Sequence, residues 1–236
     1  MNFSPNKGRC PKDRGVGRIY MKNSFINIHS HTPLNFPDLI TIYNLIPGEI
    51  SYENYFSAGI HPWFIDELNF ENQLKNLEVI LQNKYCIFIG ECGLDKLKCS
   101  DFAIQQKVFS AQINLAVKFG KPMIIHCVKA FDETISLFKN KISSDKIIFH
   151  GFHKSAELAL DLTSEGFYIS LGKIFFSHPE KAKVILEKVN HEKLFLETDD
   201  MDISIEEIYQ KASELSGKPP HFWREQMHTN FNCILV

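Results

Sequence analysis

The chain has no long apolar run. None of its hydrophobic stretches reaches the roughly 18 residues that a membrane-spanning helix needs. Its first residues also lack the apolar core of a secretory signal, because Lys7, Arg9 and Arg14 lie there among glycines and prolines. The sequence therefore predicts a protein that has no membrane partner.

Closely spaced cysteine pairs are absent too. The chain has six cysteines in 236 residues, and none of them forms a Cys-x-x-Cys motif. A chain of this length can bury a core without covalent cross-links. We therefore expect six reduced thiols and a cytoplasmic protein.

No charge of one sign dominates the chain. It has 26 lysines and arginines against 28 aspartates and glutamates, for a net charge of −2. Such a balance produces no strong field toward nucleic acid or a membrane surface, although it does not exclude a DNA substrate. The composition indicates no protein partner, and it leaves open whether the chain is a monomer or an oligomer.

What the chain does have is apolar material for one large core, since 44% of its residues are hydrophobic and 12% are aromatic. One shift in composition, near residue 24, separates a basic, aperiodic stretch from the rest. We interpret residues 1–24 as an N-terminal extension, either a disordered tail or a start assigned upstream of Met21. A basic arm for nucleic acid is the alternative. Residues 25–236 are then a single domain.

Within that domain, short apolar runs alternate with amphipathic stretches. Eight runs read as strands, at 25–31, 39–46, 55–60, 86–91, 122–127, 147–150, 167–171 and 194–199. Stretches with helical spacing lie at 70–81, 101–119, 131–138, 156–162 and 179–189, and two more, at 205–215 and 223–234, should cover the outside of the sheet. Alternation of this kind implies a parallel sheet, and eight strands suggest closure. The predicted fold class is α/β, a (β/α)8 TIM barrel.

Several of these runs end in a metal-binding type of side chain. Glu91 follows one run between two glycines, and the others end in His29 and His31, His126, His150 and Asp199. Side chains alternate along a strand, so His29 and His31 share a face. Active sites of parallel barrels lie at the carboxyl ends of the strands. Four imidazoles and two carboxylates at one such end form the ligand set of a metal centre.

With these residues in order, the chain resembles the TatD family of metal-dependent hydrolases over residues 25–234. The resemblance rests on six motifs: His29-Ser-His31, Gly59-Ile-His61-Pro62, Gly90-Glu-Cys-Gly-Leu-Asp95, Ile125-His126, His150-Gly-Phe152 and Glu197-Thr-Asp199. Members described as enzymes are metal-dependent deoxyribonucleases, and the resemblance implies that activity here.

The resemblance also implies a role for each residue. His29, His31 and Asp199 would hold one divalent metal ion, His126 and His150 a second, and Glu91 would bridge the two. Zinc, magnesium or manganese suits such ligands. Asp199 would also accept the proton of the attacking water, so Asp199 and Glu91 are the predicted catalytic residues. His61 is assigned to phosphate contact, with packing on Trp63 as the alternative.

The chain departs from the family pattern around the substrate. Val128 stands where members carry an arginine two residues after the fifth-strand histidine, and Lys129 beside it is the candidate to supply the missing charge. The loop after Asp199 is short and acidic. Such a surface suits polymeric DNA less well than it suits a short substrate.

Three functions are consistent with the sequence. The first is a metal-dependent phosphodiesterase acting on DNA. The second is a related barrel hydrolase on a small phosphoester, lactone or amide, because His29-Ser-His31-Thr also resembles the opening motif of polymerase-and-histidinol-phosphatase-type phosphoesterases. The third is a non-catalytic metal-binding protein. Asp199 argues against the third, since a purely structural site would be closed by its ligands.

Overall fold

The computed structural model describes residues 24–33, 36–45, 54–98 and 101–236. The predicted extension, residues 1–24, lies outside these ranges except for Ser24. Among the described residues, no helix is both long enough and apolar enough to cross a membrane.

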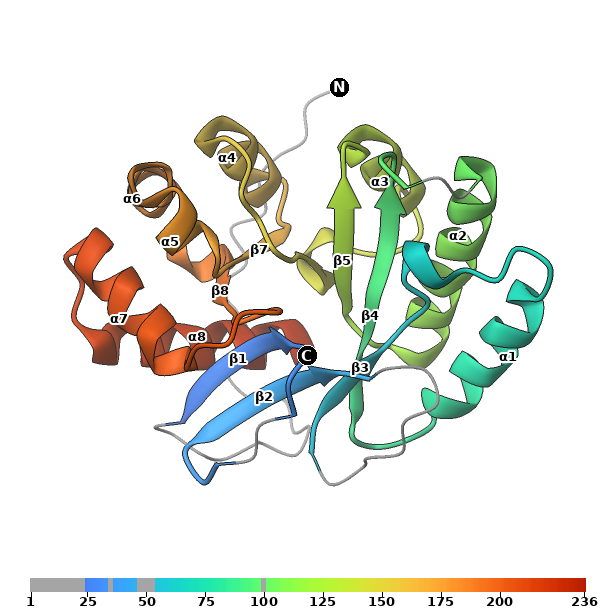
Figure 1. Ribbon diagram of the computed structural model, residues 1–236, viewed down its shortest axis with the longest axis horizontal. Helices are drawn as coiled ribbons and strands as arrows, with labels where there is room; N and C mark the ends of the chain where they lie inside the picture. Colours follow the sequence, from blue (N-terminus) through green and yellow to red (C-terminus); the bar gives the residue numbers. More distant parts are fainter. Residues whose placement is uncertain (1–23, 34–35, 46–53, 99–100) are drawn as a thin grey trace.

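The core of the molecule is an eight-stranded parallel sheet whose strands follow one another in chain order (Figure 1). Five of the strands, β1, β3, β6, β7 and β8, are buried along their whole length, as expected for strands covered on both faces. The eight are β1 (Phe25–Ser30), β2 (Leu39–Asn44), β3 (Phe56–Ala58), β4 (Cys86–Asp95), β5 (Met123–Val128), β6 (Ile147–Phe149), β7 (Tyr168–Leu171) and β8 (Leu194–Leu196). All eight predicted strands are confirmed.

Hydrogen bonds between the first and the last strand segments close the sheet into a barrel. At the carboxyl end, His31 N donates to Asp199 O at 3.0 Å, and Asp199 N donates to His29 O at 3.1 Å. Farther down, side chains take over: Asn27 Nδ2 donates to Thr198 Oγ1 at 2.9 Å, and Thr198 N donates to Asn27 Oδ1 at 3.0 Å. The predicted (β/α)8 barrel is therefore confirmed.

Helices surround the strands, and their ends follow the sequence. Asp101 caps α2 by accepting from Ala103 N and Ile104 N, and Gly120 ends it in the left-handed conformation. The helices are α1 (Phe70–Ile80), α2 (Phe102–Phe119), α3 (Phe131–Phe138), α4 (Ala156–Ser164), α5 (Ile174–Ser177), α6 (Pro179–Lys188), α7 (Ile205–Ser216) and α8 (Pro220–Leu235). The sequence did not predict the short α5.

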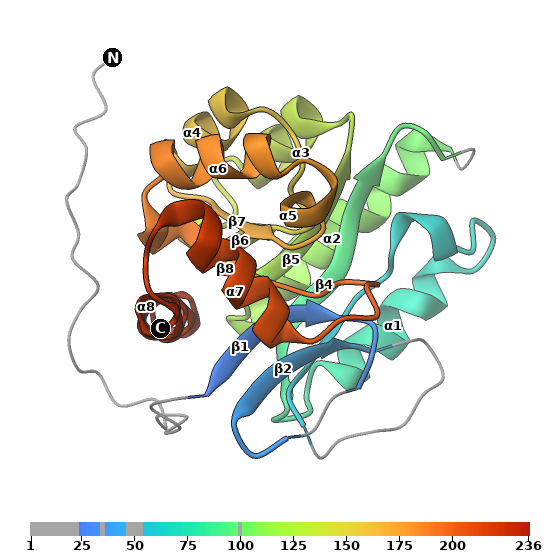
Figure 2. The ribbon, with the colours of Figure 1, turned by 60° about the vertical axis from the view of Figure 1, so that its left-hand side comes forward.

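The last helix, α8, covers the amino-terminal end of the barrel and not its outside, which corrects the sequence expectation (Figure 2). His228 donates to Ser24 O just before β1, and Asn230 Nδ2 donates to Leu194 O at the start of β8. Lys146, immediately before β6, donates to Ile234 O. With this end closed, the opposite end is left for a site.

One cysteine corrects the expectation of six reduced thiols. Cys86, Cys92 and Cys127 are free, but Cys233 in α8 is disulfide-bonded. Spacing along the chain did not reveal this bond, because a disulfide depends on which cysteines the fold brings together.

We predict that Tyr209→Phe weakens the barrel at the junction of β1 and β8. The buried Tyr209 hydroxyl accepts from Ile26 N and donates to Ile26 O, both at 3.0 Å. Its loss leaves two buried backbone groups of β1 without these partners. The free energy of unfolding in urea should fall by about 1–3 kcal/mol. Tyr55→Phe, at a half-buried tyrosine with no hydroxyl bond among the described contacts, is the control and should change it little. Equal effects of the two substitutions would contradict this role.

Candidate metal centre

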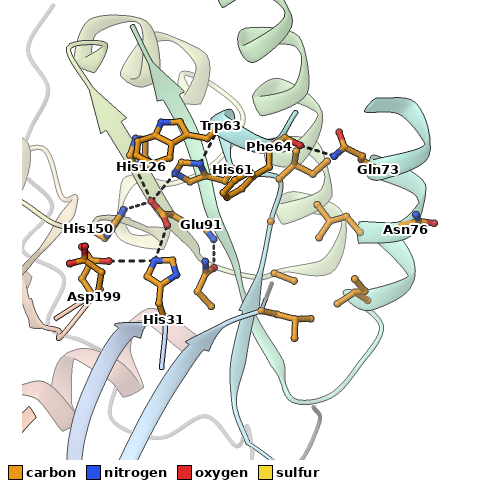
Figure 3. A pocket seen from close by; sticks show the side chains of 18 residues that line it. His31, His61, Trp63, Phe64, Gln73, Asn76, Glu91, His126, His150 and Asp199 are labelled. Atoms are coloured by element: carbon orange, nitrogen blue, oxygen red, sulfur yellow. Dashed lines mark hydrogen bonds and ion pairs between the residues drawn. The ribbon is translucent and has the colours of Figure 1, made fainter. Parts of the chain in front are cut away.

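All six predicted ligands meet at the carboxyl end of the barrel. Figure 3 shows all of them except His29. His29 lies near the end of β1 and His31 just beyond it. Glu91 lies within β4 and His126 within β5, while His150 and Asp199 follow β6 and β8. Because parallel strands end at the same edge of a barrel, residues 170 positions apart in the sequence face one another here.

Glu91 is at the centre of the cluster, and its two oxygens face different histidines. Oε2 lies 3.6 Å from His29 Nε2 and 3.4 Å from His31 Nε2. Oε1 lies 2.8 Å from His126 Nδ1 and 2.7 Å from His150 Nε2. Asp199 Oδ1 joins the first group, 3.6 Å from His29 Nε2 and 3.5 Å from His31 Nε2. The cluster therefore has two halves that share one carboxylate.

The backbone of β4 holds Glu91 in this position. The strand continues beyond Glu91 to Asp95, and its pairing with β5 shifts between Ile89 and Cys92. Gly93 allows the close approach of β5, because a Cβ there would lie 1.9 Å from His126 O. Asn44, the last residue of β2, accepts from Glu91 N at 2.8 Å. Asn44 is a positioning residue that the sequence did not reveal.

The histidines carry buried nitrogens without hydrogen bonds. Neither ring nitrogen of His29 has a partner within hydrogen-bonding geometry, and the residue is fully buried; His150 Nδ1 is in the same condition. Buried polar groups in native proteins are nearly always paired, so these lone pairs and N–H groups need an explanation. A cation at the cluster provides one for His29, since an imidazole nitrogen is a good ligand for zinc or manganese. The donor set therefore fits divalent metal ions.

The carboxylates of the cluster are ionised. Burial acts to raise the pKa of Glu91, but the imidazoles of His150 and His126 outweigh it and hold that pKa well below its usual range. For Asp199, burial likewise opposes ionisation, while the hydrogen bond to His31 and the charge of His150 lower its pKa to about 2. Reciprocally, hydrogen bonds to Asp199 and Glu91 raise the pKa of His31 to about 9. The carboxylates thus attract positive charge to this place.

Two further acids stand behind the histidines. Asp95 Oδ2 lies 3.3 Å from His126 Nε2, and Glu197 Oε1 lies 3.9 Å from His150 Nδ1 and accepts from Gly151 N at 2.6 Å. Carboxylates in this place orient a ligating imidazole and fix its tautomer. Neither acid was assigned a role from the sequence. The sequence did contain a signal for both, because each acid lies at the carboxyl end of a strand: Asp95 ends β4 and Glu197 directly follows β8.

The two predicted substrate residues lie in different surroundings. His61 points into the cluster, with Nε2 at 3.1 Å from Glu91 Oε1, and it can also be grouped with Glu91 and His126 as a cation site. Lys129 is exposed, directly after β5, with a φ of 53°. It is not among the described residues that line the pocket. Its role stays a prediction.

A pocket of about 540 Å³ opens beside the cluster. On one side it is lined by the polar groups of His31, Glu91, His126, His150 and Asp199. The other side is largely apolar and is formed by residues near β2, β3 and α1, including Leu45, Ile60, Phe64 and Leu77. Figure 3 shows His31, His61, His126 and His150 converging on Glu91. Such a mixture of convergent polar groups and apolar walls is typical of ligand pockets.

Comparisons with known proteins agree with this geometry. A family model described as TatD related DNase matches residues 24–234. The 3'-5' ssDNA/RNA exonuclease TatD of Edwardsiella piscicida is 30% identical over 183 residues, which cover 72% of this chain and 70% of that protein. An uncharacterized metal-dependent hydrolase of Buchnera aphidicola is 32% identical over 173 residues. That alignment covers 70% of this chain but only 62% of the Buchnera protein, so the chain spans less than two thirds of this relative's length.

A solved structure supports the fold. The crystal structure of a TatD homologue from Escherichia coli superposes with a TM-score of 0.73 at 20% identity. The match covers 91% of this chain and 98% of that one. At this identity, the likeness shows the barrel alone.

We predict that divalent metal stabilises the folded chain. A ligand present at 100 times its dissociation constant adds about 2.7 kcal/mol to the free energy of unfolding. The melting temperature should fall after chelation and rise again with zinc, manganese or magnesium. In Glu91→Gln the rise should shrink, because the shared carboxylate serves both halves of the cluster. Glu187→Gln, at an exposed glutamate of α6, should keep the full rise. A melting temperature that none of the three ions moves would contradict the assignment.

Proposed function

Because the chain belongs to the family of TatD-related DNases, we propose that it is a metal-dependent hydrolase that cleaves phosphodiester bonds of nucleic acid. The proposal rests on the position of the Glu91 carboxylate. One of its oxygens faces His29 and His31, and the other faces His126 and His150. This arrangement suits two cations side by side with a shared carboxylate ligand.

In this proposal, His29, His31 and Asp199 would hold one ion and His126 and His150 the other, and Glu91 would contribute an oxygen to each. Zinc, manganese and magnesium all accept carboxylate ligands, and imidazole favours zinc or manganese. When bound, such ions neutralise charge on a phosphate and make water easier to deprotonate. Asp95, 3.3 Å from His126 Nε2, orients that imidazole, while Glu197 lies 3.9 Å from His150 Nδ1, near enough for its charge to act but too far for a hydrogen bond.

Asp199 accepts the proton of the attacking water. Its side chain is 23% exposed and lines the pocket, whereas the Glu91 side chain is only 5% exposed. Of these two acids, Asp199 is thus the one that solvent and substrate can reach. Against the effect of burial, the hydrogen bond to His31 lowers its pKa, so Asp199 is ionised at neutral pH and its oxygens can accept a hydrogen bond from water.

His61 contacts the substrate phosphate in this proposal. Its Nδ1 accepts a hydrogen bond from Trp63 N at 3.1 Å, so the ring hydrogen sits on Nε2, which points at the cluster. A metal ligand needs a lone pair on the nitrogen that faces the ion, whereas a phosphate oxygen needs a donor. This tautomer favours phosphate contact over ligation. The ammonium of Lys129 supplies further positive charge at the rim.

A second candidate, hydrolysis of a small phosphodiester, is favoured by the apolar wall of Leu45, Ile60 and Leu77. A small ester with an apolar group could be enclosed there more fully than a polymer. The names of the relatives, an ssDNA/RNA exonuclease and a human 3'-5' RNA nuclease, favour nucleic acid. Cytoplasmic location stays a prediction, and the disulfide at Cys233 argues against it, because each such bond takes up two of the thiols on which the prediction depends.

A hydrolysis panel tests the proposal. Purified protein is chelated, reloaded with each divalent ion in turn, and given single-stranded DNA, duplex DNA, RNA and small phosphodiesters. We expect metal-dependent cleavage of nucleic acid. Cleavage of the small esters alone would contradict the proposal and support the second candidate, hydrolysis of a small phosphodiester. A protein that binds metal but cleaves none of these substrates would contradict the proposed phosphodiesterase.

We predict that Asp199→Asn lowers turnover on the best substrate by about 10² to 10⁴, the usual effect of a positioned base. The amide preserves the shape of the side chain but cannot accept the proton. Metal content by elemental analysis, measured beside turnover, separates loss of the base from loss of the ion. The neighbouring exposed Asp202→Asn is the control. Near wild-type turnover of Asp199→Asn would show that the reaction uses another base.

A further inference from the structure

Trp63 is an exposed aromatic ring at the edge of the metal centre. It lies in a short 3-10 helix, Pro62–Phe64, directly after His61, and it lines the pocket. The residue is 48% exposed, and the adjacent Phe64 is 63% exposed. The ring centres of His61 and His126 lie 5.1 Å and 5.9 Å from that of Trp63. These two adjacent exposed rings form an apolar surface beside a polar pocket, where a bound ligand could contact them.

The indole is held in place by a buried acid. Trp63 Nε1 donates to Asp95 Oδ2 at 2.7 Å, and Asp95 is only 3% exposed. The other oxygen of Asp95 accepts from Leu97 N at 2.8 Å. The same carboxylate also faces His126 Nε2 at 3.3 Å, so one side chain orients both the indole and a predicted metal ligand. An exposed indole could donate to water, so this bond serves to fix the plane of the ring.

A cation lies over the ring. Lys98 Nζ is 4.4 Å from the indole centre, and Lys98 is exposed on the turn that follows β4. Aromatic rings with neighbouring cations are the usual elements of surfaces that bind single-stranded nucleic acid, where bases stack and phosphates pair with lysine or arginine.

We propose that Trp63 is a stacking platform for one unpaired nucleobase, next to the phosphate that the metal centre holds. The base takes the place of the ammonium on the indole face, and Lys98 turns to an adjacent phosphate. Bases inside a duplex already stack on their neighbours, so the platform selects single-stranded nucleic acid or an unpaired end. This inference rests on the proposed function and adds to it a residue that contacts a base of the substrate.

Tryptophan fluorescence gives a direct test. The chain has two tryptophans, and Trp223 is fully buried in α8 at the opposite end of the barrel. Metal-loaded protein is titrated with short single-stranded oligonucleotides whose phosphorothioate linkages slow cleavage. An abasic strand of the same length and charge is the control ligand, because it has the phosphates but no bases. The strand with bases should quench the fluorescence and bind about tenfold more tightly than the abasic strand.

Substitutions separate stacking from a structural role. Trp63→Leu should weaken binding of the strand with bases about tenfold, measured by anisotropy of a labelled oligonucleotide, and leave the abasic strand unchanged. Leu68→Ala, at a leucine that is 94% exposed, should change neither. Equal binding of the two strands by the wild type, equal weakening of both by Trp63→Leu, or no binding of either would overturn the inference.

The outcome is independent of hydrolysis. If the protein discriminates between the two strands but cleaves no nucleic acid, the proposed function fails and the platform stands. If it cleaves nucleic acid with no such discrimination, the proposed function stands and the platform fails.

Discussion

The structure depends on one buried carboxylate placed among imidazoles. Glu91 is 5% exposed, and a lone charge at that depth would be strongly destabilising. Five histidine nitrogens lie within 3.6 Å of its oxygens, and they come from β1 and its end (His29 and His31), the segment after β3 (His61), β5 (His126) and the end of β6 (His150). The barrel therefore has to close correctly before Glu91 has its partners. Protons provide part of the compensation in the free protein, and divalent cations would replace them at the same positions.

Barrel closure and the metal centre use the same residues. The backbone of His29, His31 and Asp199 joins β1 to the segment after β8, and the side chains of these three residues form one half of the cluster. Below them, Asn27 and Thr198 continue the junction. A cation bound by these side chains would hold the two ends of the sheet together.

Much of this arrangement could be predicted from the sequence, because strand position determines where a side chain points. Apolar runs ending in His29, His126 or Glu91 were enough to place the predicted ligands at one end of a barrel. Contacts between distant surface segments were not predictable in this way. The bond from Trp63 to Asp95, the place of α8 beneath the barrel and the disulfide at Cys233 depend on how helices and turns pack. No periodicity in the chain encodes them.

Substrate choice has to come from outside the metal cluster. Cations held by imidazoles and carboxylates attract the phosphate of any ester, so they cannot distinguish DNA from a small phosphodiester. The groups that can are those at the rim: the fixed indole of Trp63 with Lys98, and the apolar wall containing Ile60 and Leu77. Of these, only Trp63 is both exposed and locked by a hydrogen bond to a residue that also faces a predicted metal ligand. Asp95 thus fixes the distance between the place where a base would stack and the place where a phosphate would be held.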